Sequence, residues 1–266
     1  MSEILPEEYS ENLNKFFTAL SQTYKSAEEG YKKELQHFFE VLGTQYRIVK
    51  KVEDEFNYRF GIKFNLVEIF KPDEERISGI IAELLKPNGS HGQREVFLKQ
   101  FLRKISDEID KVKTQREEEN WLRKEYKWDE IEIATEVDIE KGRIDILIKL
   151  SDSGAIAIEN KPWAGEQGSQ LQRYVDYLEN KYGREKKNYL LIFLTTEGRK
   201  PESLDNKKRE ELEKAGKFVV LSYNKFLKNW LKECIKLCEA EKVRTFLKDF
   251  ITWIEKYFPE NNFSKE

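Results

Sequence analysis

The chain has 266 residues, of which 47 are Lys or Arg and 50 are Asp or Glu, so its formal net charge is −3. A hydrophobic content of 39% is enough for a buried core, which excludes a disordered chain. Because the net charge is weakly acidic, the composition does not indicate a nucleic-acid partner, as that of a strongly basic domain would. Binding of a polyanion therefore has to be argued from a local site.

Residues 1–65 are expected to form a helical N-terminal region. Between Tyr9 and about Val41 there is no proline, and apolar residues such as Phe17 and Tyr24 recur at helical spacing. The segment is acidic, which is typical of a solvated helix face. Long terminal helices are compatible with a homodimer, and equally with helices that pack on the core.

A second helix is expected to begin at Asp73, which is placed to cap it, and to end before Pro87. Its apolar residues form one stripe. At about 100° per residue, Glu74 falls about 50° from the centre of that stripe, whereas Glu75 falls about 150° away. Only Glu74 therefore leans toward the core, where a carboxylate needs a partner or a metal. The alternative is a first-turn glutamate that only interacts with the helix dipole.

The middle of the chain has the pattern of strands. Residues 132–139, 143–150 and 155–161 alternate with period two and predict an antiparallel meander. A helix follows, and short apolar runs at 189–195 and 218–223 predict buried strands. The fold class is therefore α/β (an α+β mixed sheet) with helices packed on it. The core is expected to span 66–223, with C-terminal helices in 224–266 packed on that core.

The predicted hairpin of the second and third strands brings charged residues together. Its isoleucines share one face, Ile144 among them, only if the connecting loop has an odd number of residues. A loop of residues 151–153 places Asp145 opposite Glu159, and a loop of residues 152–154 places it opposite Lys161. In either register Asp145, Glu159 and Lys161 lie on one face.

Two carboxylates beside an ammonium have two explanations. Acidic neighbours repel, and a divalent cation such as Mg²⁺ or Mn²⁺ removes the repulsion and leaves room for a phosphate. The lysine would then orient or deprotonate a water, or neutralise charge on the phosphate. The other explanation is an ordinary cross-strand salt bridge, which pattern alone favours slightly.

The helix after Lys161 adds polar side chains near the same place. Gln170 and Tyr174 are four residues apart and share one helix face. Because this helix begins near the lysine, the two side chains are placed to contact phosphate or to hydrogen-bond to the strand ends.

At these residues the chain resembles the PD-(D/E)XK nuclease superfamily, and within it a branch with GRxD, IENK and QLxRY motifs. Here the motifs read GRIDILI, IAIENKPWAGEQ and QLQRY, and the branch's upstream helix resembles EERIS followed by LLKPNGSHG. The four motifs occur in order between about Phe64 and Leu194. Two positions depart from the pattern, because Ile144 replaces the proline that gives the family its name and Ile77 stands where a histidine is common.

The resemblance implies a restriction-endonuclease-like core with helical N- and C-terminal additions, and a metal-dependent nuclease. It implies that Asp145, Glu159 and the main-chain carbonyl of Asn160 ligate Mg²⁺ or Mn²⁺, with Glu74 in the outer shell. Lys161 would activate or orient water, and Gln170 with Tyr174 would support the lysine or the substrate.

Other polar groups are expected to be structural. His91, in the GSHG turn, is interpreted as a turn or packing residue rather than a catalytic one. Cys234 and Cys238 could share a zinc ion by their spacing, but two small buried hydrophobic residues are the favoured interpretation. Two cysteines and the absence of a long apolar run indicate a cytoplasmic protein with no membrane segment.

The leading hypothesis is thus a nuclease that hydrolyses phosphodiester bonds of nucleic acid, DNA rather than RNA, in phage defence or mobile-element biology. One alternative is a non-catalytic module that binds nucleic acid or protein on the same fold. Another is a structural protein in which Asp145 and Lys161 only pair across the hairpin. Metal binding near Asp145 discriminates the nuclease from the binding module, and a loss of stability in Asp145→Asn would indicate the structural protein.

Overall fold

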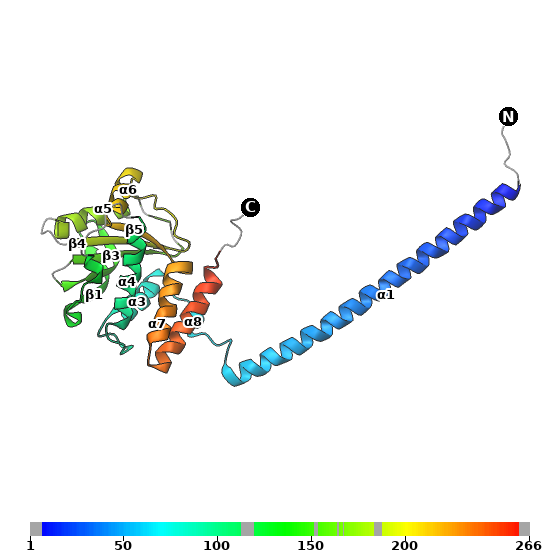
Figure 1. The fold of residues 1–266 in the computed structure, drawn as a ribbon, viewed down its shortest axis with the longest axis horizontal. Coiled ribbons are helices and arrows are strands. Elements are labelled where there is room, and N and C mark those ends of the chain that lie inside the picture. Colours follow the sequence, from blue (N-terminus) through cyan, green and yellow to red (C-terminus); the bar gives the residue numbers. More distant parts are fainter. Residues whose placement is uncertain are drawn as a thin grey trace, which may run out of the picture. The chain divides into compact units, whose positions relative to one another are not determined.

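The computed structural model describes residues 7–112, 120–151, 154–163, 165–166, 168–183 and 188–260, without the side chains of residues 7–10. The chain divides into two compact units, residues 1–64 and 65–266. In its described residues the first unit contains one helix, α1 (Glu7–Phe60), of 54 residues (Figure 1). Ion pairs between residues four apart, such as Lys32 with Glu28 at 2.8 Å, line its polar side. The helix ends at Gly61, whose φ of 59° lies in the region that glycine adopts without strain.

The second unit is built on a five-stranded sheet in which the strands lie in chain order. The first three strands form an antiparallel meander, and the last two continue parallel to the third. The strands are β1 (Glu132–Ile139), β2 (Gly142–Lys149), β3 (Gly154–Lys161), β4 (Asn188–Thr195) and β5 (Phe218–Ser222). The predicted mixed sheet is therefore confirmed.

Helices cover both faces of the sheet (Figure 1). One face packs against α2 (Leu66–Phe70), α3 (Glu74–Leu85), α4 (Val96–Asp110), α7 (Lys228–Leu237) and α8 (Glu241–Tyr257). The other face packs against α5 (Gln170–Leu178) and α6 (Asn206–Lys214). Short helical turns cover Trp121–Arg123, Trp128–Glu130, Glu179–Gly183 and Tyr223–Leu227. Among the described residues, none of the helices is long and apolar enough to cross a membrane.

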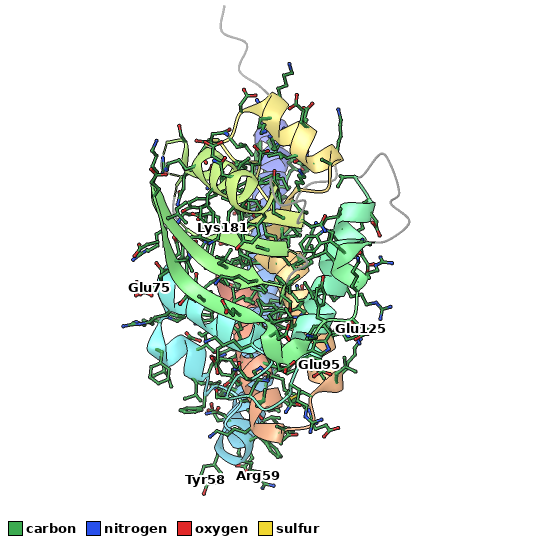
Figure 2. The ribbon with its side chains drawn as sticks, turned by 90° about the vertical axis from the view of Figure 1, so that its left-hand side faces the viewer. Tyr58, Arg59, Glu75, Glu95, Glu125 and Lys181 are labelled. Atoms are coloured by element: carbon green, nitrogen blue, oxygen red, sulfur yellow. The ribbon has the colours of Figure 1, made fainter. Side chains whose placement is uncertain are left out.

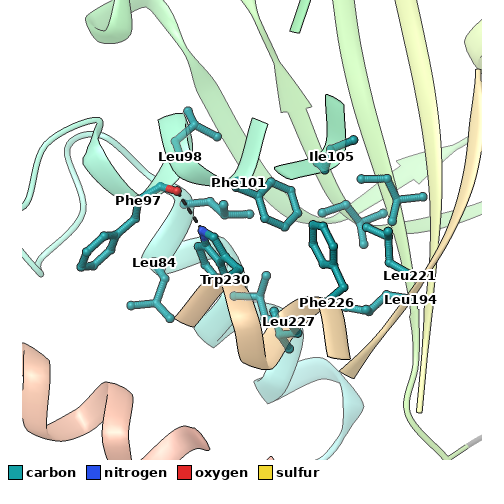
Figure 3. Close-up of a cluster of buried hydrophobic side chains, with 14 of the residues drawn as sticks. Leu84, Phe97, Leu98, Phe101, Ile105, Leu194, Leu221, Phe226, Leu227 and Trp230 are labelled. Carbon is teal, nitrogen blue, oxygen red and sulfur yellow. Dashed lines mark hydrogen bonds between the residues drawn. The ribbon is translucent and has the colours of Figure 1, made fainter. Parts of the chain in front are cut away.

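Aromatic side chains join the C-terminal helices to the sheet (Figure 3). Phe101 packs edge-on against Trp230 and Phe226, with ring centroids 5.2 and 5.7 Å away. The indole nitrogen of Trp230 donates a hydrogen bond of 3.0 Å to the carbonyl of Phe97. Burial of each such side chain contributes roughly 2–3 kcal/mol. The residues after Asn224 thus share one core with the sheet.

The β2–β3 hairpin adopts the first of the two predicted registers. Ile146 pairs with Ile158, and the amide of Leu150 donates to the carbonyl of Gly154 at 2.9 Å. Of the predicted loop 151–153, residues 152 and 153 lie outside the described part of the chain. Gly154 is required at the start of β3, because a Cβ there would lie 2.0 Å from the carbonyl oxygen of Asn188.

The expected alternation of β2 breaks at Ile144, which is a correction to the sequence interpretation. Ile146 faces α3 and α4, but Ile144 packs with Tyr174 in the cluster under α5. The β2–β3 pairing ends at Ile146, whereas β2 stays paired with β1 as far as Gly142. On β1, Glu136 lies between Thr135 and Val137, which pair with Ile146 and Ile144. Glu136 has a φ of 52°, a conformation that locally distorts a strand. Side chains alternate between the two faces only while the strand backbone keeps regular β geometry.

Candidate active site

Charged side chains converge at the end of β3, where three consecutive residues differ in burial and in the direction of their side chains. Glu159 is 1% exposed, Asn160 is fully buried, and the side chain of Lys161 is 10% exposed. The ammonium nitrogen of Lys161 lies 2.9 Å from Oε1 of Glu159. Period-two alternation places Glu159 and Lys161 on the same side of the strand, and Asn160 on the other.

Asp145 is held beside this strand end by the main chain. Its Oδ2 accepts a hydrogen bond of 2.6 Å from the amide of Asn160. In the register of this hairpin, that amide would otherwise face the main chain of Ile144. The carboxylate thus replaces a backbone acceptor where β2 and β3 separate. The carbonyl of Asn160 points to the same side as its amide, and so toward Asp145.

Glu74 comes from α3, and its direction agrees with the prediction. Asp73 caps the helix, because its side chain accepts a hydrogen bond of 2.9 Å from the amide of Arg76. Glu74 is partly buried and forms an ion pair with Lys161, whereas Glu75 is exposed at the outer surface of α3 (Figure 2). Lys161 therefore lies between two carboxylates, one from its own strand and one from a helix 87 residues away.

The site holds more negative charge than its single lysine balances. Burial raises the pKa of Asp145 to about 6. Burial and the nearby charge of Asp145 raise the pKa of Glu159 to about 8. Burial alone would lower the pKa of Lys161, but the negative charge of Glu159 and the hydrogen bond to Glu74 outweigh it and raise that pKa. The site thus favours an additional positive charge, either protons or a cation.

A divalent metal fits this arrangement. Neither carboxylate oxygen of Glu159 has a donor in good hydrogen-bond geometry, although both oxygens are buried and Lys161 is close. Within the described residues, no three His, Cys, Asp or Glu side chains are grouped to hold an ion by themselves. The groups that could serve as donors are instead Asp145, Glu159 and the carbonyl of Asn160. Mg²⁺ accepts such a set, because it binds through one or two carboxylates and keeps several waters.

Gln170 and Tyr174 support the start of β2. The hydroxyl of Tyr174 donates to the carbonyl of Arg143 at 2.5 Å and accepts from Nε2 of Gln170 at 2.9 Å. Both side chains are buried. Burial raises the pKa of Tyr174, and the charges of Glu159 and Asp145 add to this effect. The pair therefore positions the segment that carries Asp145.

The sequence interpretation missed the side-chain contacts of Asn160. Its Nδ2 donates to Oγ of Ser78 at 2.9 Å, and its Oδ1 accepts from the hydroxyl of Tyr223 at 2.5 Å. These bonds tie β3 to α3 and to the end of β5. Ser78 belongs to the EERIS motif, so the motif pointed to one partner, but nothing local in the sequence points to Tyr223.

A further carboxylate, Glu136 on β1, was also missed. It forms an ion pair with Arg143, which follows the β1–β2 turn and lies two residues before Asp145 on β2. Burial raises the pKa of Glu136, and its charge in turn raises the pKa of Asp145. The positive φ of Glu136 marks this residue in the structure, but a backbone torsion angle cannot be read from the sequence.

His91 has the contacts of a structural residue. Its Nδ1 accepts from the amide of Gln93 at 3.0 Å, so Nε2 carries the hydrogen and donates to the carbonyl of Lys86 at 2.9 Å. The ring also stacks on Phe97. Cys234 and Cys238 are both buried and free, and burial raises the pKa of Cys234, which disfavours the thiolate that zinc needs.

Comparison with known proteins gives one match. Searches of curated proteins and of solved structures returned no match. A family model described as PD-(D/E)XK nuclease superfamily matches residues 63–252, which include the whole sheet and every site residue described above. The chain belongs to the PD-(D/E)XK nuclease superfamily.

Proposed function

We propose that the protein is a metal-dependent nuclease that hydrolyses phosphodiester bonds of nucleic acid, with DNA rather than RNA as its substrate. The observation that carries the proposal is the burial of two carboxylates, those of Asp145 and Glu159, beside the single ammonium of Lys161. An ordinary salt bridge does not need two buried carboxylates for one ammonium. Membership of the superfamily supports the same conclusion.

The side chains suggest a division of roles. Asp145, Glu159 and the Asn160 carbonyl would hold Mg²⁺ or Mn²⁺, with Glu74 in the outer shell. When bound, the ion would supply charge stabilisation at the phosphate and an acidic water. Lys161, an ammonium held between Glu74 and Glu159, would orient the attacking water and neutralise charge on the phosphate. Gln170 and Tyr174 would act as positioning residues through Arg143.

An exposed aromatic residue beside the lysine favours a nucleic-acid substrate. Trp163, two residues after Lys161, exposes 53% of its surface, and its ring packs edge-on against Trp253 at 6.0 Å. An exposed indole that is held in place by a second ring suits stacking with a nucleobase. As part of the proposal we place the protein in the cytoplasm, since both cysteines are buried and free. A role in phage defence or mobile-element biology remains a prediction.

The test is cleavage of supercoiled plasmid, linear duplex, single-stranded DNA and single-stranded RNA by the full chain, with Mg²⁺ or Mn²⁺ and with EDTA. We expect metal-dependent cleavage of DNA that Asp145→Asn abolishes. Asp138→Asn is the matched control, because Asp138 is an exposed aspartate on the neighbouring strand β1. Metal-independent activity, or equal activity of the two variants, would contradict the proposal. Binding of DNA without cleavage under all conditions would favour a non-catalytic module.

A further inference from the structure

An apolar stripe runs along α1. The stripe runs from Leu13 to Phe56, and each member lies three or four residues after the one before it. Every member is apolar except Gln45. The mean step is about 3.6 residues, so the stripe follows one side of a nearly straight helix. This alternation of three and four is the spacing of helices that pack lengthwise on each other.

The stripe is not covered within its own unit. Its large members each expose between 42% and 70% of their surface. In the described part of residues 1–64, α1 is the only helix, and no strand accompanies it. Soluble proteins rarely leave an apolar surface of this extent open to water, and helices gain most of their stability from packing of such a face.

A compact domain of this chain is too small to cover the stripe. A helix of 54 residues is about 81 Å long at about 1.5 Å per residue. A globular unit of about 200 residues is only roughly 40 Å across, from the usual scaling of radius with length. Residues 65–266 could therefore cover about half of α1 at most.

A second copy of α1 matches the stripe along its whole length. The two surfaces have the same length and the same spacing, so each side chain finds a gap between four residues of the partner. The exposed parts of the stripe amount to on the order of 1,000 Å² per copy, compared with about 800 Å² per partner in a standard stable interface. Apolar residues such as Val41 and Ile48 widen the stripe on one flank.

We propose that α1 is an oligomerisation helix, which packs lengthwise against α1 of a second copy of this chain through the stripe from Leu13 to Phe56. This inference does not depend on the nuclease activity, because it rests on α1 alone. Charged residues opposite the stripe, such as the pair of Lys15 and Glu11, remain on the outer side of the pair of helices.

The test is the mass of the full chain in solution, measured by light scattering or sedimentation between about 1 and 100 µM. We expect at least twice the single-chain mass of 31.8 kDa. The double variant Leu35→Glu/Leu42→Glu adds two charges inside the stripe and should shift the mass toward one chain. The control Gln36→Glu/Thr44→Glu adds the same two charges outside the stripe and should keep the wild-type mass.

Folding of the second unit is checked on each variant by its thermal transition, which should not change, because the substitutions lie in residues 1–64. A wild-type mass of 31.8 kDa over the whole range would overturn the proposal and favour packing on another protein or on the chain's own second unit. A double variant that associates as strongly as the control would overturn it as well.

Discussion

Two lysine–glutamate pairs on neighbouring strands show how different such pairs can be. Lys149 and Glu132 face each other across β1 and β2 at 2.5 Å, with their side chains 44% and 69% exposed. The hydrogen bond from Lys149 lowers the pKa of Glu132, as expected of an ordinary surface pair. Lys161 and Glu159 have side chains only 10% and 1% exposed, and the pKa of Glu159 is raised to about 8.

The difference lies in the ratio of charges. The surface pair has one carboxylate for one ammonium, and water solvates both. The buried lysine is shared by Glu74 and Glu159, with Asp145 beside them, so the buried acids lack part of their compensation. Buried acids whose charge is only partly compensated cluster at functional sites. The exposed pair thus has the properties of a structural pair, and the buried pair those of a candidate site. Matched substitutions in the two pairs test this difference.

The largest expected effect is on cleavage by Lys161→Ala. Loss of the ammonium that contacts Glu74 and Glu159 should lower the rate of plasmid cleavage in Mg²⁺ by at least about 100-fold, the usual cost of removing a group that stabilises developing charge. Lys149→Ala should keep the rate within about twofold, because its pair is exposed. Equal losses in the two variants would mean that the buried pair has no special role.

The next effect is on metal binding by Glu159→Gln. Replacing one of two anionic ligands by an amide should weaken Mn²⁺ binding by about 100-fold or more, measured by calorimetry. The fold should survive, because glutamine resembles the protonated acid that a pKa of about 8 favours at neutral pH. Glu132→Gln should bind Mn²⁺ like the wild type. If Glu159→Gln also bound Mn²⁺ normally, the ion would have to lie elsewhere.

A third effect concerns the stability of the metal-free protein. Asp145 binds its proton more tightly in the folded chain than in the unfolded chain, so its burial costs stability as the pH rises from about 4 through about 6. Asp145→Asn should therefore raise the free energy of unfolding by about 1–3 kcal/mol at pH 8, and the gain should vanish below pH 4.

Urea unfolding in EDTA at several pH values measures this difference. Asp138→Asn, on exposed Asp138, should show no comparable gain. Added Mg²⁺ should stabilise the wild type more than Asp145→Asn, since only the wild type keeps both carboxylates. A stability of Asp145→Asn that is lower than wild type in EDTA would support the purely structural interpretation of Asp145.

The smallest effect is expected from Tyr223→Phe. It removes the hydroxyl that donates to buried Asn160 Oδ1, which should lower the free energy of unfolding by about 1–2 kcal/mol. Tyr257→Phe, at a residue 42% exposed, should change it by less than about 0.5 kcal/mol. If both variants unfolded like the wild type, Asn160 would not depend on Tyr223 for its position.

The sequence was sufficient for the features that depend on local pattern. Alternation predicted the meander, the odd loop limited the hairpin to two registers, and helical spacing predicted that Glu74 leans inward while Glu75 does not. These predictions succeed because the periods of strands and helices follow from backbone geometry. The choice between the two registers needed the structure, because it depends on the packing of both strands.

The features that depend on long-range contact were not predictable. Ile144 leaves the expected face where the β2–β3 pairing ends and where β1 has the positive φ of Glu136, and the pattern carries no sign of either feature. Asn160 finds its partners 82 residues away at Ser78 and 63 residues away at Tyr223. Such partners are chosen by tertiary packing, which a period in the sequence does not record.

The most direct test of the metal site is a crystal of the wild-type protein soaked in Mn²⁺, with the ion located by its anomalous scattering. The account predicts one ion shared by the carboxylates of Asp145 and Glu159 and the carbonyl of Asn160, with Lys161 next to it. A map with no ion there, and with Lys161 still between Glu74 and Glu159, would contradict the account.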